Sequence, residues 1–274
     1  MDSNSNGRLE NLNSQELEEF ESSGLEKLIG IFVEPVRIFK SIKQFGSNIY
    51  DWLFPILFFL ITLLLADLMV TAIPSIRFSM LEKQATEIRE KFAPLIADGT
   101  LTEEAVNEEI ETLKKHYADG LTSTKLTEAF YITVIELFKF LVIFLFFHFL
   151  IKYLHHGEIK FRDSLTALGL PLYIKAFGNV FLIIAGLITS TYLSDMSIAT
   201  LAGISNDSIF GFLLHKSDLF SIWYFLLVAF GFIVMHRLSN KYKVIVVIFS
   251  AWISSGLFFF WLVKLFGYSG PNNL

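Results

Sequence analysis

The amino-acid sequence predicts an all-α polytopic integral membrane protein with five transmembrane helices. Hydrophobic residues make up 53% of the 274 residues, and 30 of them are phenylalanine, more than one soluble core of this size would bury. The apolar residues gather in five blocks, at about 52–76, 130–153, 164–192, 219–236 and 244–266. Each block is near or above the roughly 20 residues that a helix needs to cross about 30 Å of hydrocarbon.

The connections between these blocks predict how the chain is oriented. Residues 1–23 hold six acidic residues and one arginine and no apolar core, which predicts a disordered acidic cytoplasmic tail and not a secretory signal. Basic residues precede the first block and fill the second and fourth connections: Arg37, Lys40, Lys43, Lys152, Lys160, Arg162, Arg237, Lys241 and Lys243. The positive-inside rule therefore places the N-terminus in the cytoplasm and the short tail at 267–274 outside.

Residues 24–46 predict an amphipathic segment that lies in the cytoplasmic membrane interface. Apolar residues recur at helical spacing, and Pro35 is suited to start a second short helix. They are Leu25, Leu28, Ile29, Phe32, Val36, Phe39 and Ile42. A helix of this type, basic near its end, binds lipid through its apolar face.

The long first connection, 77–129, predicts an extramembrane helical hairpin. Two apolar stripes share one spacing, Leu81, Ala85, Ile88 and Phe92 in the first and Val106, Ile110, Leu113 and Tyr117 in the second. Pro94 and Gly99 interrupt the pattern between them, and Thr100 to Glu103 resembles a capping box. Helices that merely lengthen the neighbouring spans explain the stripes equally well.

Composition and motifs exclude several kinds of chemistry. The chain has no cysteine, so disulfides, thiolate zinc sites and cysteine nucleophiles are absent. It contains no Walker A loop, nucleophile elbow or HExxH, and nothing suggests nucleic acid, so we expect no enzymatic activity and no cofactor. His148, His155 and His156 lie near one interface, but adjacent histidines cannot share a helical face, and we expect no metal site. Small residues around Ser250 and Ser254 fit packing within the monomer or in a homo-oligomer.

Four charged residues inside the apolar blocks form the candidate site: Asp67, Glu136, Lys139 and Lys175. At about 1.5 Å per helical residue they fall within a layer roughly 10 Å thick. Charges at such depth are expected to pair inside the bundle, Asp67 with Lys139, and Glu136 with Lys175 or Lys139. The cluster is either a structural clamp between helices or a site where ions or protons move. The clamp is favoured because the sequence shows neither broken helices with Gly-rich unwinding nor a repeat of its first half in its second.

Three short stretches carry a resemblance to a known family. The tail and IFVEPVRIFKSI precede five spans; DWLFP holds Asp51 and Pro55; and SLTALGLPLYI holds Pro171. In this order they resemble the Yip1 domain family over about residues 25–266. Asp51 and Pro55 match the Asp and Pro of the DLYGP motif, and Pro171 matches the proline of the GYxxxP motif. Phe54 replaces the glycine of the first motif, and Thr166 and Ala167 replace the Gly-Tyr of the second, which indicates a divergent, bacterial member.

Physical explanations for the three motif residues stand beside this resemblance. Pro55 in the first turn of a helix lacks an N–H that would be unbonded anyway, and Asp51 suits the positive end of the helix. Pro171 is expected to kink the third span and Pro74 to end the first.

The resemblance implies a five-span fold in a bacterial cytoplasmic membrane, whereas the Rab-type GTPase partners of eukaryotic relatives are not expected in a bacterium. We therefore expect a non-enzymatic scaffold or interaction protein, embedded in the lipid bilayer, with protein partners at the cytoplasmic tail or the external hairpin. The alternative is a small transporter, or an ion- or proton-conducting protein, that uses the intramembrane charges.

Overall fold

A computed structural model describes residues 23–155, 159–204 and 208–266, and every regular element in these ranges is an α-helix. The helices are α2 (Gly24–Val33), α3 (Pro35–Phe45), α4 (Tyr50–Ala72), α5 (Pro74–Ala97), α6 (Glu103–Ala118), α7 (Ser123–His155), α8 (Phe161–Gly169), α9 (Leu172–Thr189), α10 (Ile198–Ala202), α11 (Ile209–Lys216), α12 (Leu219–Met235) and α13 (Lys241–Phe266). The predicted tails at 1–23 and 267–274 lie outside the described residues, apart from Ser23.

Four helical segments are long and apolar enough to cross a membrane. They are Tyr50–Ala72, Ser123–Leu154, Phe161–Thr189 and Lys241–Leu262. A fifth forms only if α11 and α12 count as one span, because the two helices meet at an angle of 67°. The described part of the chain therefore contains four or five spans. Each span begins and ends within a few residues of a predicted block, with two exceptions: α7 begins earlier, at Ser123, and α11 precedes the predicted block at 219–236.

The surface of the long spans is apolar, as lipid contact requires. In the most apolar window of each of the four straight spans, only 11% to 28% of the residues are buried inside the protein. Large side chains such as Phe54 and Phe58 on α4 and Phe138 and Phe146 on α7 face outward. A soluble protein does not expose so continuous an apolar surface, so these helices indicate an integral membrane protein.

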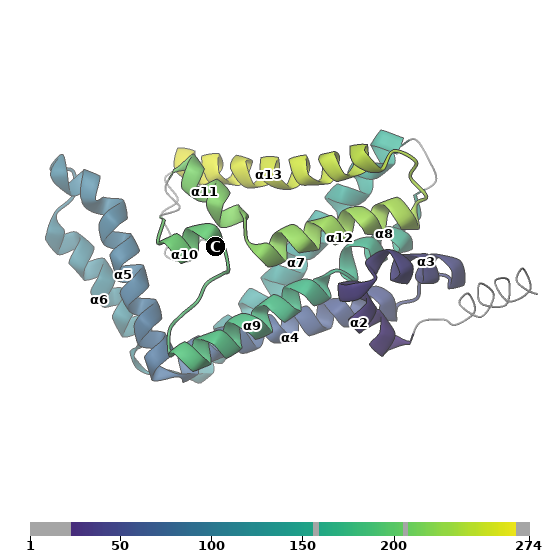
Figure 1. The fold of residues 1–274 in the computed structure, drawn as a ribbon. Helices are drawn as coiled ribbons and strands as arrows, with labels where there is room; N and C mark the ends of the chain where they lie inside the picture. The colour runs from purple at the N-terminus through teal and green to yellow at the C-terminus, as the bar shows by residue number, and fades with distance from the viewer. Residues whose placement is uncertain (1–22, 156–158, 205–207, 267–274) are drawn as a thin grey trace, which may run out of the picture.

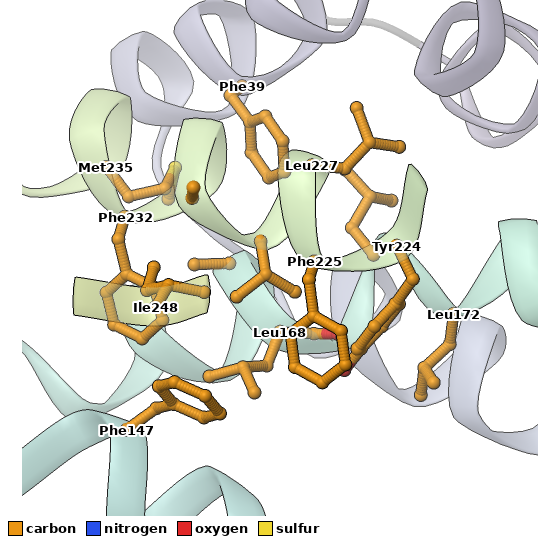
Figure 2. Packing of buried hydrophobic residues seen from close by; sticks show 14 of the residues in the cluster. Phe39, Phe147, Leu168, Leu172, Tyr224, Phe225, Leu227, Phe232, Met235 and Ile248 are labelled. Carbon is orange, nitrogen blue, oxygen red and sulfur yellow. The ribbon is translucent and has the colours of Figure 1, made fainter. Parts of the chain in front are cut away.

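Helix α12 lies at the centre of the core. It packs against α3, α8, α9 and α13, and Figure 2 shows Phe39 of α3 above Leu227 and Phe225 of α12. Glycines allow the closest approaches: a Cβ on Gly231 would lie 2.9 Å from the backbone of Ala167, and one on Gly169 would lie 2.8 Å from Cβ of Trp52. Helix α8 is therefore held tightly between α4 and α12.

The N-terminal helices α2 and α3 are amphipathic, and they also pack against the rest of the protein. Ile31, Ile38, Phe39 and Ile42 are at most 2% exposed and belong to the main core. The prediction that Phe39 and Ile42 face lipid is therefore wrong, because α3 lies across α12 and these side chains fill the space between them. A second stripe on α2, formed by Leu25, Ile29 and Val33, remains exposed.

Helices α5 and α6 form the predicted hairpin. Ala85, Val106 and Ile110 are buried against one another, with Ile88 and Phe92 packed beside them, so the two predicted stripes do face each other. Helix α4 ends at Ala72, just before Pro74, as expected, and Pro74 then begins α5. Thr102 and not Thr100 caps α6, through its hydroxyl and the N–H of Ala105. Figure 1 shows the hairpin projecting from the end of the bundle opposite to α2 and α3.

Candidate functional site

Seven buried polar side chains, together with the partly buried Lys43 and His236, gather where α2 and α3 meet the bundle. We call this set the junction layer; it comprises Lys27, Lys43, Ser47, Asp51, His148, Asp163, Ser164, Thr166 and His236. The members come from the N-terminal helices and the linker after them, the start of α4, the first two turns of α8 and the C-terminal parts of α7 and α12. They therefore connect segments that are far apart in the sequence.

The first contact of the junction layer joins α2 to α4. Lys27 Nζ lies 2.7 Å from Oδ1 of Asp51, and the two residues are 8% and 2% exposed. The backbone N–H of Asn48 donates to Oδ2 of Asp51 at 2.8 Å, and the Asn48 side chain accepts from the N–H of Tyr50 and Asp51. Asp51 therefore starts α4, as the sequence indicates, and also holds a buried cation.

Helix α8 supplies the remaining contacts from its first two turns. Lys43 Nζ of α3 binds Oδ2 of Asp163 at 2.7 Å. The hydroxyls of Ser47 and Thr166 lie 2.5 Å apart, which fixes the linker between α3 and α4. Thr166, which replaces the glycine of the family motif, is thus a structural contact here.

Ser164 connects two histidines in the same layer. Its hydroxyl is 2.9 Å from Nδ1 of His148 and 3.0 Å from Nε2 of His236. A serine hydroxyl carries one proton, so it donates to one ring and accepts from the N–H of the other. Ser164 is fully buried, which prevents contact with a substrate. Its two hydrogen bonds instead connect α7, α8 and the end of α12.

The histidines do not assemble a metal site in the part of the chain that the structure describes. No group of three or more His, Cys, Asp or Glu residues there is placed to hold a metal ion. His148 points to Ser164, while the side chains of His155 and His156 lie outside the described residues.

The family-motif prolines mark irregular backbone. Pro55 is the sixth residue of α4, so it lies in the second turn and not, as expected, in the first. Its missing N–H leaves the carbonyl of Asp51 without its helical partner. Pro171 separates α8 from α9, and these two helices still form one span of 29 residues, as the predicted kink requires.

The four intramembrane charges do not form one cluster. Lys139 binds Glu136 at 2.6 Å on its own helix, and 53% of its side chain is exposed toward the outside of the bundle. The alternative pair of Glu136 with Lys139 is thus confirmed, whereas the predicted pair of Asp67 with Lys139 is wrong. The expectation that all four charges face the interior is also wrong. The cause is local: the i, i+3 spacing on α7 satisfies Lys139 without any contact across helices.

Asp67 forms no ion pair or hydrogen bond with a described residue, and it is partly exposed near the hairpin end of α4. It lies within electrostatic range of Glu136 and of Tyr117 at the end of α6. Burial, together with the carboxylates of Asp67 and Glu128, raises the pKa of the Tyr117 phenol.

Lys175 binds at the break between α11 and α12 and not to Glu136. Its Nζ lies 2.5 Å from Oγ of Ser221 and 3.7 Å from Oδ2 of Asp218. Asp218 also caps α12 by accepting from the N–H of Ser221 at 2.8 Å. Helices α11 and α12 meet here at 67° across Ser217 and Asp218, which makes a broken span, without Gly-rich unwinding, if the two helices count as one.

Two recesses lie near the α2–α3 end of the chain. One, of about 370 Å³, is a shallow surface formed by residues 239–242 in the turn before α13. The other, of about 350 Å³, lies beside Lys27 and Asp51. Neither includes Asp67, Glu136, Lys139 or Lys175 in its lining.

The sequence contained a usable signal for only part of the junction layer. Asp51 was identified from its motif position. Lys27 was not identified, although it lies four residues before Ile31 and therefore on the same apolar face of the helix, which was the available sign that it is buried. The partners Asp163, Ser164 and Thr166 gave no periodic signal, because their contacts depend on tertiary packing.

Comparison of the chain with known protein families, characterised proteins and solved structures finds no significant match. The resemblance to the Yip1 domain family therefore remains a prediction.

Proposed function

We propose that this chain is a multi-pass membrane protein of the Yip1 type that acts as a non-enzymatic scaffold or interaction protein in a bacterial cytoplasmic membrane. One observation carries the proposal: the buried ionic contacts join parts of the molecule, Lys27 to Asp51 and Lys43 to Asp163, while the intramembrane charges are dispersed. Polar groups gathered at joints stabilise an arrangement of helices and do not line a route through the membrane.

The placement of the surfaces supports this proposal. Helices α2 and α3 stand at one end of the bundle and the hairpin at the other, so the two ends offer separate binding surfaces (Figure 1). The basic residues at the α2–α3 end support a cytoplasmic N-terminus. The fifth span, with α11 and α12 counted together, supports an external C-terminus.

The α5–α6 hairpin is the proposed partner-binding surface. Ala85, Val106 and Ile110 are buried between its two helices, and the exposed side of α6 is polar and suited to an aqueous compartment. Exposed charges of both signs lie along α6, among them Glu104, Glu108, Lys114 and Lys115. Such a surface favours a soluble or membrane-bound protein partner recognised by charge.

Site-specific photo-crosslinking in the host membrane tests the scaffold proposal. A photoreactive amino acid at Glu108, on the exposed face of α6, is expected to yield one discrete protein adduct. The same amino acid at Phe138, on the outward apolar face of α7, is the matched control and is expected to label lipid only. A hairpin that yields no protein adduct, together with no adduct from Lys40 at the other end, would contradict the proposal.

A transporter or ion-conducting protein is the second candidate, and the broken helix favours it. Helices interrupted within a membrane place backbone dipoles and charged groups where ions bind in many transporters. Lys175, Asp218 and Ser221 stand at such an interruption. This candidate requires that the purified protein carry a measurable ion or proton flux.

A further inference from the structure

The recess beside the junction layer has the features of a binding site. It has a volume of about 350 Å³ and lies between the start of α2, the start of α4 and the α8–α9 turn. Its lining includes Lys27, Asn48, Asp51, Phe54 and Tyr173. Charged, amide, phenolic and aromatic groups thus meet in one open hollow.

Lys27 is a buried cation whose hydrogen-bonding capacity is only partly used. It is 8% exposed, and it donates one hydrogen bond, to Asp51 at 2.7 Å. An ammonium group carries three donors, so two of them have no partner among the described residues. These two donors lie beside the recess and are available to acceptor oxygens of a ligand bound in it.

The position of the recess in the membrane indicates the source of those oxygens. Tyr50 and Asp51 form the first turn of the spanning helix α4, where the apolar surface begins. The rings of Tyr50 and Phe54 are stacked with centroids 5.1 Å apart, and both are exposed. Exposed aromatic residues at the end of a span lie at headgroup level, where phosphoryl oxygens are abundant.

The charge of the recess selects among phospholipids. The lining holds one cation, Lys27, and one carboxylate, Asp51, so it carries no net charge. An anionic headgroup would approach Asp51 with no second cation in the lining to balance it. A zwitterionic headgroup avoids this, because its phosphoryl group approaches Lys27 while its ammonium meets the carboxylate side and the faces of Tyr50, Phe54 and Tyr173.

We infer that this recess binds the zwitterionic headgroup of a phospholipid, of the phosphatidylethanolamine or phosphatidylcholine class, with its acyl chains along the apolar surface of α4. The exposed stripe of Leu25, Ile29 and Val33 on α2 extends the lipid-facing surface beside the recess. The inference requires that α4 crosses the membrane, and it does not depend on the proposed scaffold role.

Native mass spectrometry of the full chain in detergent, with defined lipids added, tests the inference. One phosphatidylethanolamine molecule is expected to be retained in preference to phosphatidylglycerol. Phe54→Ala removes an exposed ring without touching the ion pair and is expected to reduce retention several-fold. The double variant Lys27→Met with Asp51→Asn removes both charges together and is expected to lower retention about tenfold or more, as for the loss of charged hydrogen bonds.

Arg37→Gln is the matched control, because Arg37 pairs with Glu34 on the exposed surface of α3 and lies outside the recess. It is expected to leave retention unchanged, and a thermal melt of each variant verifies folding. The inference would be overturned if the parent protein retained phosphatidylglycerol more strongly than phosphatidylethanolamine. It would also be overturned if folded Phe54→Ala retained each lipid as well as the parent protein does. Competition by inorganic phosphate alone would also overturn it, because the site would then recognise a free anion and not a lipid.

Discussion

At the scale of single residues, stability depends on a few buried charges that are paired across the joint between α2 and α4. Lys27 and Asp51 are both more than nine-tenths buried. Removing one member of such a pair leaves an uncompensated charge, whereas removing both leaves neutral groups of similar volume. The pair is therefore expected to behave as a unit in mutagenesis.

A double-mutant cycle on this pair gives the first prediction. Lys27→Met alone is expected to lower the free energy of unfolding by about 3–5 kcal/mol. The double variant with Asp51→Asn is expected to recover most of that loss, as measured by denaturant unfolding in detergent. Lys114→Met on α6, whose partner Glu111 is exposed, serves as control and is expected to cost about 1 kcal/mol or less. Additive losses in the cycle would mean that the two residues do not act as a pair.

Asp195 gives a prediction of pH dependence at the end of the bundle that bears the hairpin. Burial raises the pKa of this carboxyl, but hydrogen bonds from Ser197, Thr200 and Ser194 outweigh it and hold the pKa below its usual value. The stability that these bonds contribute is present above the ordinary pKa of about 4 and is lost as the pH falls through the lowered value.

Hydrogen exchange of the α10 amides, corrected for the intrinsic effect of pH, measures this dependence. Protection is expected to be constant above about pH 5 and to decrease below about pH 4. Asp195→Asn is expected to show low protection at both pH values. Protection that increases on acidification would contradict the assignment of these bonds to an ionised carboxylate.

At the scale of elements, the tight placement of α8 between α4 and α12 depends on glycine. Gly231→Val would bring a side chain within about 3 Å of the backbone of Ala167 and is expected to cost about 1–3 kcal/mol of stability through overpacking. Gly24→Ala is the matched control, because a Cβ there meets nothing within 4 Å and α2 gains helix propensity. A thermal melt that ranks the two variants in the opposite order would show that the approach of α12 to α8 is loose.

Most elements were predictable from the sequence because the signals are local. Length and hydropathy define the spans, Pro35 begins a helix, Pro74 follows the end of α4, and two stripes of equal spacing define the hairpin. The break before α12 was not predicted, because α11 is short and the polar pair Ser217 and Asp218 resembled the end of an external loop. The docking of α3 on α12 was missed because an amphipathic pattern has the same form whether its apolar face meets lipid or protein.

The candidate site was less predictable than the fold. Depth along a helix placed Asp67, Glu136, Lys139 and Lys175 in one layer, but depth does not fix the direction in which a side chain points. The rotation of α7 directs Lys139 outward, and the break at Asp218 supplies a nearer partner for Lys175. Pairing across helices depends on tertiary geometry that a single sequence does not encode in its spacing.

At the scale of the whole molecule, α2 and α3 lie at one end and the α5–α6 hairpin at the other, with long apolar helices forming the body between them (Figure 1). The junction layer fixes α2 and α3 on one end, and hydrogen bonds from Lys83 to Ser194 and from the N–H of Tyr192 to Ser79 attach α5 to the loop after α9 at the other. This arrangement suits a protein that presents surfaces on both sides of a membrane.

Flux through the purified protein in liposomes tests the central claim, that the charges of the junction layer hold the helices together and that the intramembrane charges do not conduct. Proton and monovalent-ion flux of the folded protein is expected to equal that of empty liposomes. Asp67→Asn and Lys175→Met are expected to change nothing. A flux above empty liposomes that either substitution abolishes would contradict the account and assign the intramembrane charges to transport.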